Sequence, residues 1–301
     1  MVKEINVWFE RRLSERTLRQ LREVAPSPRR PLTGDARGTL LALAVFLFFG
    51  CETAVDWDFK PQENGELAVE AILTNELKNQ EVVLSLTFND LNGEPQPATG
   101  AQVRVRGAGE THLFAEDPDK AGRYVSQEAF AGQLFTPYSL EIEWEGQTYE
   151  AEAQMVQVLP FQPVTFSSYG ATDSVVIGNV PNLFSPHEQA LYIIDIDWSH
   201  LIPGASSRAR LFYYTFNTVD VSELFRPPQE TVPIPRGSVV VQSKYSLAPG
   251  FAAYIRALAM ENEWQGGFFD ESSATPPTNI SNGGQGYFGV CAVVRDTLVA
   301  E

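Results

Sequence analysis

The feature that most constrains the fold of this chain is a regular alternation of apolar and polar residues between Glu66 and Val158. In Leu140–Trp144 the apolar residues alternate with glutamates, and Tyr149–Ala153 repeats the pattern after Gly146-Gln147. Successive side chains of a β-strand point to opposite faces, so this period predicts half-buried strands. The two segments therefore predict a hairpin with one polar face and one buried face.

Further short strands with the same period precede this hairpin. They are expected at Leu67–Ala71, Val83–Phe88 and Val103–Val105, with another starting at Tyr124. Turn-forming residues separate them at Asn92-Gly93, Gly107-Ala108-Gly109 and Pro118-Asp119. Short strands at this spacing predict an immunoglobulin-like β-sandwich domain over residues 65–158.

A second β-rich region is expected after a proline-containing break at Leu159–Pro163, which we interpret as a linker. Strands are expected at Ala190–Trp198, Ala209–Phe216 and Ser238–Gln242. Ala252–Met260 fits a strand or a short helix, and Glu261–Phe269 is the best short-helix candidate. The predicted fold class is therefore mainly β, with a sandwich domain followed by a β-rich domain over 164–301 and at most short helices.

The composition and charge indicate a folded, acidic protein. Of 301 residues, 44% are hydrophobic and 20% are charged, which is typical of a globular protein. The net charge is −16 overall, but the first fifty residues contribute +4, so the remainder carries −20. Such a surface repels nucleic acid and anionic lipid, and nucleic acid is therefore excluded as a partner.

An uncharged run near the N-terminus suggests an exported protein. Leu40–Phe49 is apolar throughout and follows three arginines, but it is too short to span a bilayer as a helix. It fits the hydrophobic region of a signal peptide. The Gly50-Cys51 pair that follows resembles the site where lipoprotein signal peptidase cuts and where the cysteine receives lipid. The acidic residues Glu52, Asp56 and Asp58 resemble a surface-export signal of Bacteroidota lipoproteins.

These observations divide the N-terminal part into a signal segment over residues 1–50 and a lipidated tether over 51–64. Two alternatives stay open. The apolar run is also compatible with a buried core helix that ends at Cys51, and the basic stretch Met1–Pro31 is also compatible with an over-extended start. If Cys51 carries lipid, Cys291 has no partner for a disulfide, and its apolar neighbours predict burial.

The motifs of common catalytic and metal sites are missing from the sequence. His112, His187 and His200 have no zinc-site spacing, and no serine lies in a Gly-x-Ser-x-Gly motif. Asp195 and Asp197 share one face of a strand close to His200, which is compatible with a metal or catalytic pair but fits a solvated strand face better. We therefore predict no catalytic residue, no cofactor and no metal ligand, and no enzymatic activity.

The order of the segments resembles a family of Bacteroidota outer-membrane lipoproteins, domain of unknown function 4249. The segments that carry the resemblance are Leu67–Thr74, Val82–Thr87, Ala101–Val105, Gly122–Tyr124, Tyr138–Ile142, Gly146–Tyr149, Asn279–Gly284 and Gly286–Gly289, with Pro277 before the last two. The glycines of the last segments indicate turns with positive φ or close backbone packing beside a final strand at Tyr287–Val294.

This resemblance implies a location and a partner but no catalytic residues. It implies a lipid-anchored outer-membrane protein that faces the cell exterior and acts as an accessory binding partner of a TonB-dependent transporter, a β-barrel protein. A structural or assembly subunit of another outer-membrane complex and a surface hydrolase are the alternatives. Ser199–Ser207, Arg226–Gly237 and Gly266–Gly284 are the expected contact regions, because they are long irregular segments.

Overall fold

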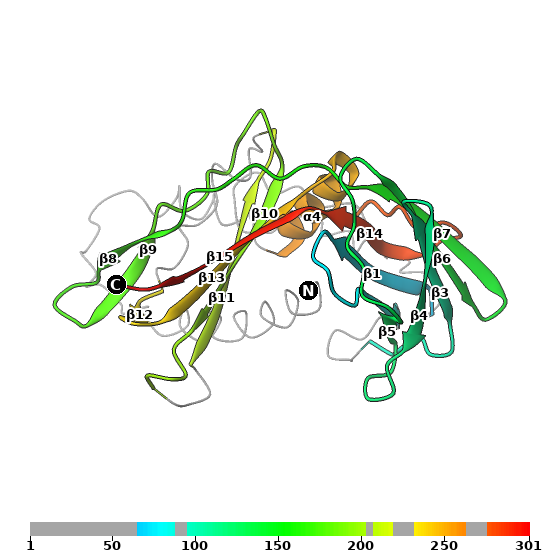
Figure 1. The fold of residues 1–301 in the computed structure, drawn as a ribbon, viewed down its shortest axis with the longest axis horizontal. Helices are drawn as coiled ribbons and strands as arrows, with labels where there is room; N and C mark the ends of the chain where they lie inside the picture. Colours follow the sequence, from blue (N-terminus) through cyan, green and yellow to red (C-terminus); the bar gives the residue numbers. More distant parts are fainter. Residues whose placement is uncertain (1–64, 88–94, 203–206, 219–231, 263–275) are drawn as a thin grey trace, which may run out of the picture. The chain divides into compact units, whose positions relative to one another are not determined.

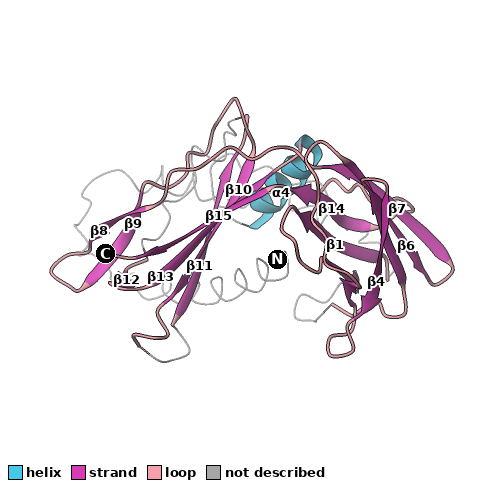
Figure 2. Cartoon of the chain, viewed as in Figure 1, coloured by secondary structure: helices cyan, strands magenta, loops and turns pink. Residues whose placement is uncertain are grey.

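The structure is a computed structural model, and it describes residues 65–87, 95–202, 207–218, 232–262 and 276–301. Strands dominate this part of the chain, and it contains a single helix, α4 (Figure 2). The predicted fold class is confirmed as mainly β with a sandwich- or barrel-like arrangement. Residues 63–301 form one compact unit.

The first sheet has eight strands in the order β14-β1-β2-β5-β4-β3-β6-β7 (Figure 1). All neighbours are antiparallel except β1 and β14, which run parallel. The strands are β1 (Leu67–Thr74), β2 (Glu81–Leu86), β3 (Gln102–Gly107), β4 (Glu110–Glu116), β5 (Arg123–Ser126), β6 (Pro137–Trp144), β7 (Gln147–Gln154) and β14 (Gln285–Cys291).

Alternation along the strands forms the core of this sheet. In β1 the buried residues Leu67, Val69, Ala71 and Leu73 alternate with partly exposed ones, as the sequence predicts. Phe288 and Val290 of β14 join the same core, although more than 200 residues separate them from β1. The last strand of this core therefore comes from the C-terminal end of the chain.

The two outer strands of the eight-stranded order, β14 and β7, are in contact. The segment before β14 bonds to β7, because Ser281 N–H donates to Glu150 O at 2.9 Å and Ser281 Oγ accepts Glu150 N–H at 2.7 Å. The Asn279 amide donates to Glu152 O at 3.1 Å. The segment thus connects both ends of the sheet, which makes it barrel-like.

The rest of the described chain forms two smaller sheets and the helix. A four-stranded sheet has the order β11-β10-β13-β15, and a three-stranded sheet has the order β12-β9-β8. Their elements are β8 (Thr165–Ser168), β9 (Ser174–Gly178), β10 (Ala190–Asp197), β11 (Arg208–Thr215), β12 (Ile234–Pro235), β13 (Val239–Ser246) and β15 (Val293–Val299), and the helix is α4 (Pro249–Asn262).

β14 and β15 follow each other as one extended stretch that is shared by two sheets (Figure 1). Only Ala292 separates them, and it exchanges bonds with Ser246 of β13: Ser246 N–H donates to Ala292 O, and Ser246 Oγ accepts Ala292 N–H, both at 2.9 Å. The Ser246 hydroxyl also donates to Val156 O at 2.7 Å. The predicted final strand Tyr287–Val294 is therefore divided between the two sheets.

One local alternative is decided and two local expectations need correction. The helix spans Pro249–Asn262, so the helical alternative for Ala252–Met260 is confirmed, while the predicted helix Glu261–Phe269 lies mostly outside the described residues. The hairpin turn is centred on Glu145 and Gly146, which have φ of 49° and 77°, one residue earlier than predicted. β4 was missed, because its sequence ETHLFAE is mostly polar and carries little apolar alternation.

Candidate functional site

The histidines and aspartates singled out in the sequence do not form a metal-binding group in the described part of the chain. Among the described residues no three His, Cys, Asp or Glu side chains are placed to hold a metal ion. His112 stacks on Phe130 with ring centroids 3.6 Å apart, and His200 Nε2 lies 3.1 Å from Gly237 O. These contacts give both rings a packing or hydrogen-bonding role.

Asp195 and Asp197 do share a face of β10, but each pairs with an arginine of β11. Asp195 contacts Arg210 at 2.5 Å, and Asp197 contacts Arg208 at 2.8 Å. The hydroxyl and N–H of Ser199 donate to Asp197 and, together with Arg208, hold the pKa of this carboxyl below its ordinary value. Both aspartates are thus cross-strand ion-pair partners.

Cys291 is a free and fully buried thiol, as its neighbours predict. Burial raises the pKa of this thiol to about 12, because a thiolate in an apolar surrounding loses its hydration. The neutral thiol is a poor nucleophile, so Cys291 is a core residue.

A pocket of about 230 Å³ lies where the linker meets the loop before β10 and the start of α4. Its lining includes Gln157, His187, Glu188, Asn217 and Pro249. Typical small-molecule sites measure roughly 300–1,000 Å³ and are mostly apolar. The volume is below this range, so the pocket is a weak candidate for a ligand site.

A buried ion pair lies beside this pocket. Lys244 of β13 is 1% exposed, and its ammonium donates to Glu188 Oε1 at 2.6 Å and to Leu159 O at 2.9 Å. The Glu188 side chain is 17% exposed and lines the pocket. The pair therefore ties the linker to β13 and to the loop before β10.

The unequal burial of the two partners predicts unequal effects of removing them. Glu188→Ala leaves an ammonium buried without its counter-ion, which is expected to lower the free energy of unfolding by about 3 kcal/mol. Lys244→Met leaves a carboxylate that can reach water in the pocket, and is expected to cost about 1 kcal/mol. Urea unfolding of the purified variants measures both values. Equal losses would contradict this account.

Three exposed apolar side chains next to the first sheet lie on two neighbouring loops. Leu77, in the β1–β2 turn, is 77% exposed, and Leu134 and Phe135, in the β5–β6 loop, are 47% and 63% exposed. The loops run side by side, because Phe130 N–H donates to Lys78 O and Gly132 N–H donates to Thr74 O. We call Leu77, Leu134 and Phe135 the apolar loop surface.

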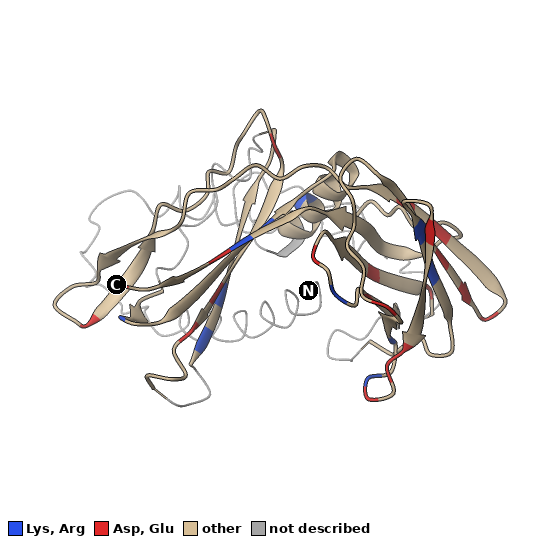
Figure 3. Ribbon diagram, in the orientation of Figure 1, with Lys and Arg blue, Asp and Glu red and all other residues tan. Residues whose placement is uncertain are grey.

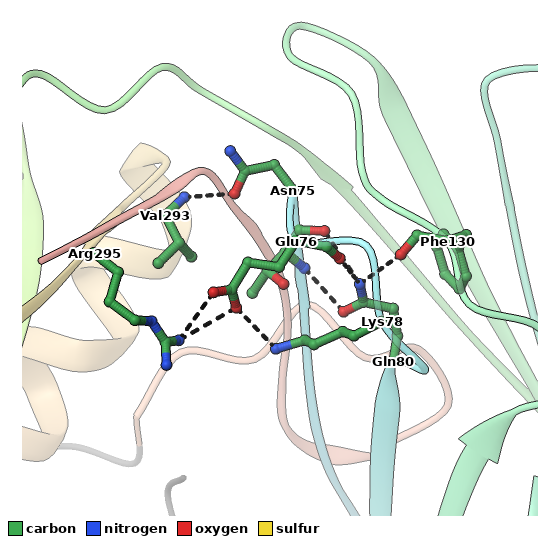
Figure 4. A network of polar contacts seen from close by, with 8 residues as sticks. Asn75, Glu76, Lys78, Gln80, Phe130, Val293 and Arg295 are labelled. Carbon is green, nitrogen blue, oxygen red and sulfur yellow. Dashed lines mark hydrogen bonds and ion pairs between the residues drawn. The ribbon is translucent and has the colours of Figure 1, made fainter. Parts of the chain in front are cut away.

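Hydrogen bonds hold the base of this surface rigidly (Figure 4). The buried Gln80 side chain accepts from Thr74 N–H and donates to the carbonyl oxygens of Thr74, Glu76 and Phe130. Glu76 also pairs with Lys78 at 3.2 Å and with Arg295 of β15 at 3.1 Å. These contacts hold the β1–β2 turn that contains Leu77.

Phe135 holds an unusual backbone conformation. Its φ is 59°, in the left-handed region that costs an L-residue about 1–2 kcal/mol. Its N–H donates to Met155 O at 2.9 Å, and its carbonyl accepts from the Gln154 amide at 2.8 Å. The fold thus maintains a strained residue whose large apolar ring points into solvent. Strain of this kind concentrates at functional sites.

Comparison with known proteins gives a family match over most of the chain. The family model described as domain of unknown function (DUF4249) matches residues 52–233. The chain belongs to this family. The DUF4249 match begins directly after Cys51 and covers β1 to β11, so it includes the apolar loop surface. It names no activity.

Other comparisons add little to the DUF4249 match. No curated protein matches the chain. A crystal structure of the FN1–FN3 domains of chicken CNTN1 is 13% identical, with a TM-score of 0.27 over 60% of this chain and 61% of that chain. The DUF4249 chain therefore spans less than two thirds of that structure's length.

The predicted contact regions have different outcomes. In Gly266–Gly284, Asn279, Ser281 and Asn282 bond to β7, while most of the preceding residues lie outside the described part. Half of Arg226–Gly237 also lies outside it, and the described half contains β12. In Ser199–Ser207, Leu201 and Ile202 are exposed. Sequence reasoning missed the apolar loop surface, although three apolar residues in short polar turns were visible signals.

The lipidation site Cys51 and the segments 1–50 and 51–64 lie outside the described residues. Within the described residues, α4 is not long and apolar enough to cross a membrane.

Proposed function

We propose that this protein is a lipoprotein of the Bacteroidota outer membrane, anchored through Cys51 and facing the cell exterior. In this proposal it acts by binding, as an accessory partner of a TonB-dependent transporter, and it has no enzymatic activity of its own. The observation that carries the proposal is the apolar loop surface, with the strained and exposed Phe135 at its edge.

Two properties of this surface support a role in protein binding. Its side chains are large and apolar, and phenylalanine is one of the aromatic residues enriched at protein interfaces. Its loops are held in place by hydrogen bonds of Gln80 and of the Phe135 backbone. A rigid surface loses little conformational entropy on binding, so more of the contact energy appears as affinity.

The lipid anchor supports the same reading. A protein and a transporter in one membrane meet at a high effective concentration, so an interface of modest area is sufficient to keep them together.

The carboxylates of β6 face arginines of β3 (Figure 3), since Arg104 contacts Glu141 and Glu143, and Arg106 contacts Glu141 at 2.8 Å. Opposite charges on this face are therefore already neutralised within the sheet.

The proposal is tested by Phe135→Asn. Asparagine adopts positive φ more easily than phenylalanine, so the free energy of unfolding is expected to stay equal or rise by up to about 1 kcal/mol. Loss of the ring is expected to lower the amount of β-barrel protein recovered with the tagged protein from native outer membranes in mild detergent. Stability comes from urea unfolding, and recovery comes from quantitative mass spectrometry.

Leu113→Ser is the matched control, because Leu113 is an exposed apolar residue on β4 that is not part of the apolar loop surface. It is expected to leave the recovery unchanged. A protein that purifies as a lone monomer would contradict the binding role itself, and equal recovery with Phe135→Asn and the parent would contradict the assignment of the surface.

A further inference from the structure

The pocket beside the buried ion pair is formed by four separate segments of the chain. They are residues 156–159 after β7, residues 186–189 before β10, Asn217 after β11, and residues 247 and 249 at the start of α4. The pocket shares no residue with the apolar loop surface. A ligand bound here is therefore independent of the binding role proposed for that surface.

Hydrogen bonds hold three of these segments in place. Ser246 Oγ donates to Val156 O at 2.7 Å, which fixes the start of the linker to the end of β13. Leu247 N–H donates to Gln189 O at 2.9 Å, which fixes the loop before β10 to the segment before α4. The walls of the pocket are thus set by the fold itself, as in most small-molecule sites, which are largely pre-formed.

Five polar side chains around the pocket have hydrogen-bonding capacity to spare. Glu188 Oε1 accepts from the Lys244 ammonium, and its Oε2 forms no hydrogen bond within the described residues. The amides and the imidazole of the lining each offer a donor and an acceptor, and the carboxylate offers an acceptor. Four further lining side chains also form no hydrogen bond within this part of the chain: Gln157, His187, Gln189 and Asn217.

The charges at the pocket are balanced. Glu188 is the one carboxylate among the described residues that line it, and no lysine or arginine is among them. The Lys244 ammonium lies 2.6 Å from Glu188 and neutralises it. A cationic ligand would be repelled by Lys244 and an anionic one by Glu188, so neither gains the attraction of a full opposite charge. The pocket therefore favours an uncharged ligand.

We propose that this pocket binds a single neutral monosaccharide. Each hydroxyl group of a sugar both donates and accepts, which matches the mixed groups of the lining. The volume of about 230 Å³ equals that of about eight liquid water molecules at roughly 30 Å³ each, so one sugar ring fits and an oligosaccharide does not. Apolar side chains provide surface for the C–H groups of the ring: Val156, Leu159, Pro186, Leu247 and Pro249.

Saturation-transfer NMR tests the proposal on the purified full chain, in a detergent without a sugar headgroup. D-glucose, D-galactose and D-mannose are the neutral probes, and putrescine and succinate are the charged probes. At least one sugar is expected to bind with a dissociation constant of about 1 mM, because a ligand of this size makes few contacts. The two charged probes are expected to give no signal.

A double variant, Gln157→Ala with Asn217→Ala, assigns the binding to the pocket. Both residues are exposed and their side chains form no hydrogen bond within the described residues, so the fold is expected to be unaffected. Loss of two hydrogen-bonding groups is expected to raise the dissociation constant about tenfold. Gln162→Ala is the matched control, because Gln162 is an exposed linker residue outside the lining, and it is expected to leave the constant unchanged.

Urea unfolding of the parent and the variants confirms that each is folded before binding is compared. Three results would overturn the proposal. They are the absence of binding by all three sugars, stronger binding of putrescine or succinate than of any sugar, and a dissociation constant that is the same for the parent and the double variant or that rises equally with Gln162→Ala.

Discussion

Replacing Cys51 by alanine is expected to move the protein from the membrane fraction to the soluble fraction. The reason is that the described chain holds no membrane-crossing helix, and the proposed anchor is the lipid on this one side chain. Each buried CH₂ of an acyl chain contributes about 0.8 kcal/mol to membrane binding, and stable anchoring needs more than one chain. Fractionation followed by immunoblotting measures the shift.

Cys291→Ala is the matched control for this experiment. The thiol of Cys291 is buried in the core and is not the proposed lipid attachment site. This variant is therefore expected to remain in the membrane fraction, with a small loss of stability. Mass spectrometry of the peptide across residues 45–60 provides an independent readout. An unmodified peptide in the mature protein, or a Cys51→Ala variant that stays with the membrane, would contradict the anchor.

Gly286→Ala is expected to lower the free energy of unfolding by about 4 kcal/mol, because it combines backbone strain with a clash inside the sheet. Gly286 has φ of 86° and faces Val69 in the parallel β1–β14 pair. A Cβ at this position lies 2.1 Å from Val69 O and 3.0 Å from Val69 C and N. Backbone atoms of a central strand cannot move aside without breaking the ladder.

Gly283→Ala separates the two contributions. Gly283 also has positive φ, 76°, but a Cβ there meets nothing within 4 Å. Only the conformational cost applies, so a loss of about 1 kcal/mol is expected. Urea unfolding of both variants gives the comparison. Similar losses would show that β14 shifts away from β1 at little cost, and that its position beside β1 contributes little to stability.

The half-buried strands could be predicted from the sequence because their period is local. β1, β6 and β7 each bury alternate residues, and this pattern is written in a few adjacent residues. The glycines near the C-terminus also predicted positive φ and close packing, and both occur at Gly286. The polar strand β4 was missed because it lacks this local alternation. Its backbone pairing with β3 and β5 stabilises it as a strand, and this pairing is not visible in its composition.

Long-range pairing was decided by the tertiary structure alone. The sequence alone did not predict that β14 joins a sheet built from residues far earlier in the chain, or that β15 continues in another sheet. The sequence pattern of a buried strand is the same whichever strand lies beside it, because hydrophobic burial has no direction. The identity of the partner strand and its register depend on the chain topology.

The candidate surfaces show the same division. The sequence by itself determined the acidic character, the strand content, the burial of Cys291 and the resemblance that the family match confirms. Only the tertiary structure decided that Asp195 and Asp197 lie opposite arginines and that Phe135 is strained and exposed. Exposure and partners depend on which distant segments cover a residue, and neighbours in sequence do not specify this.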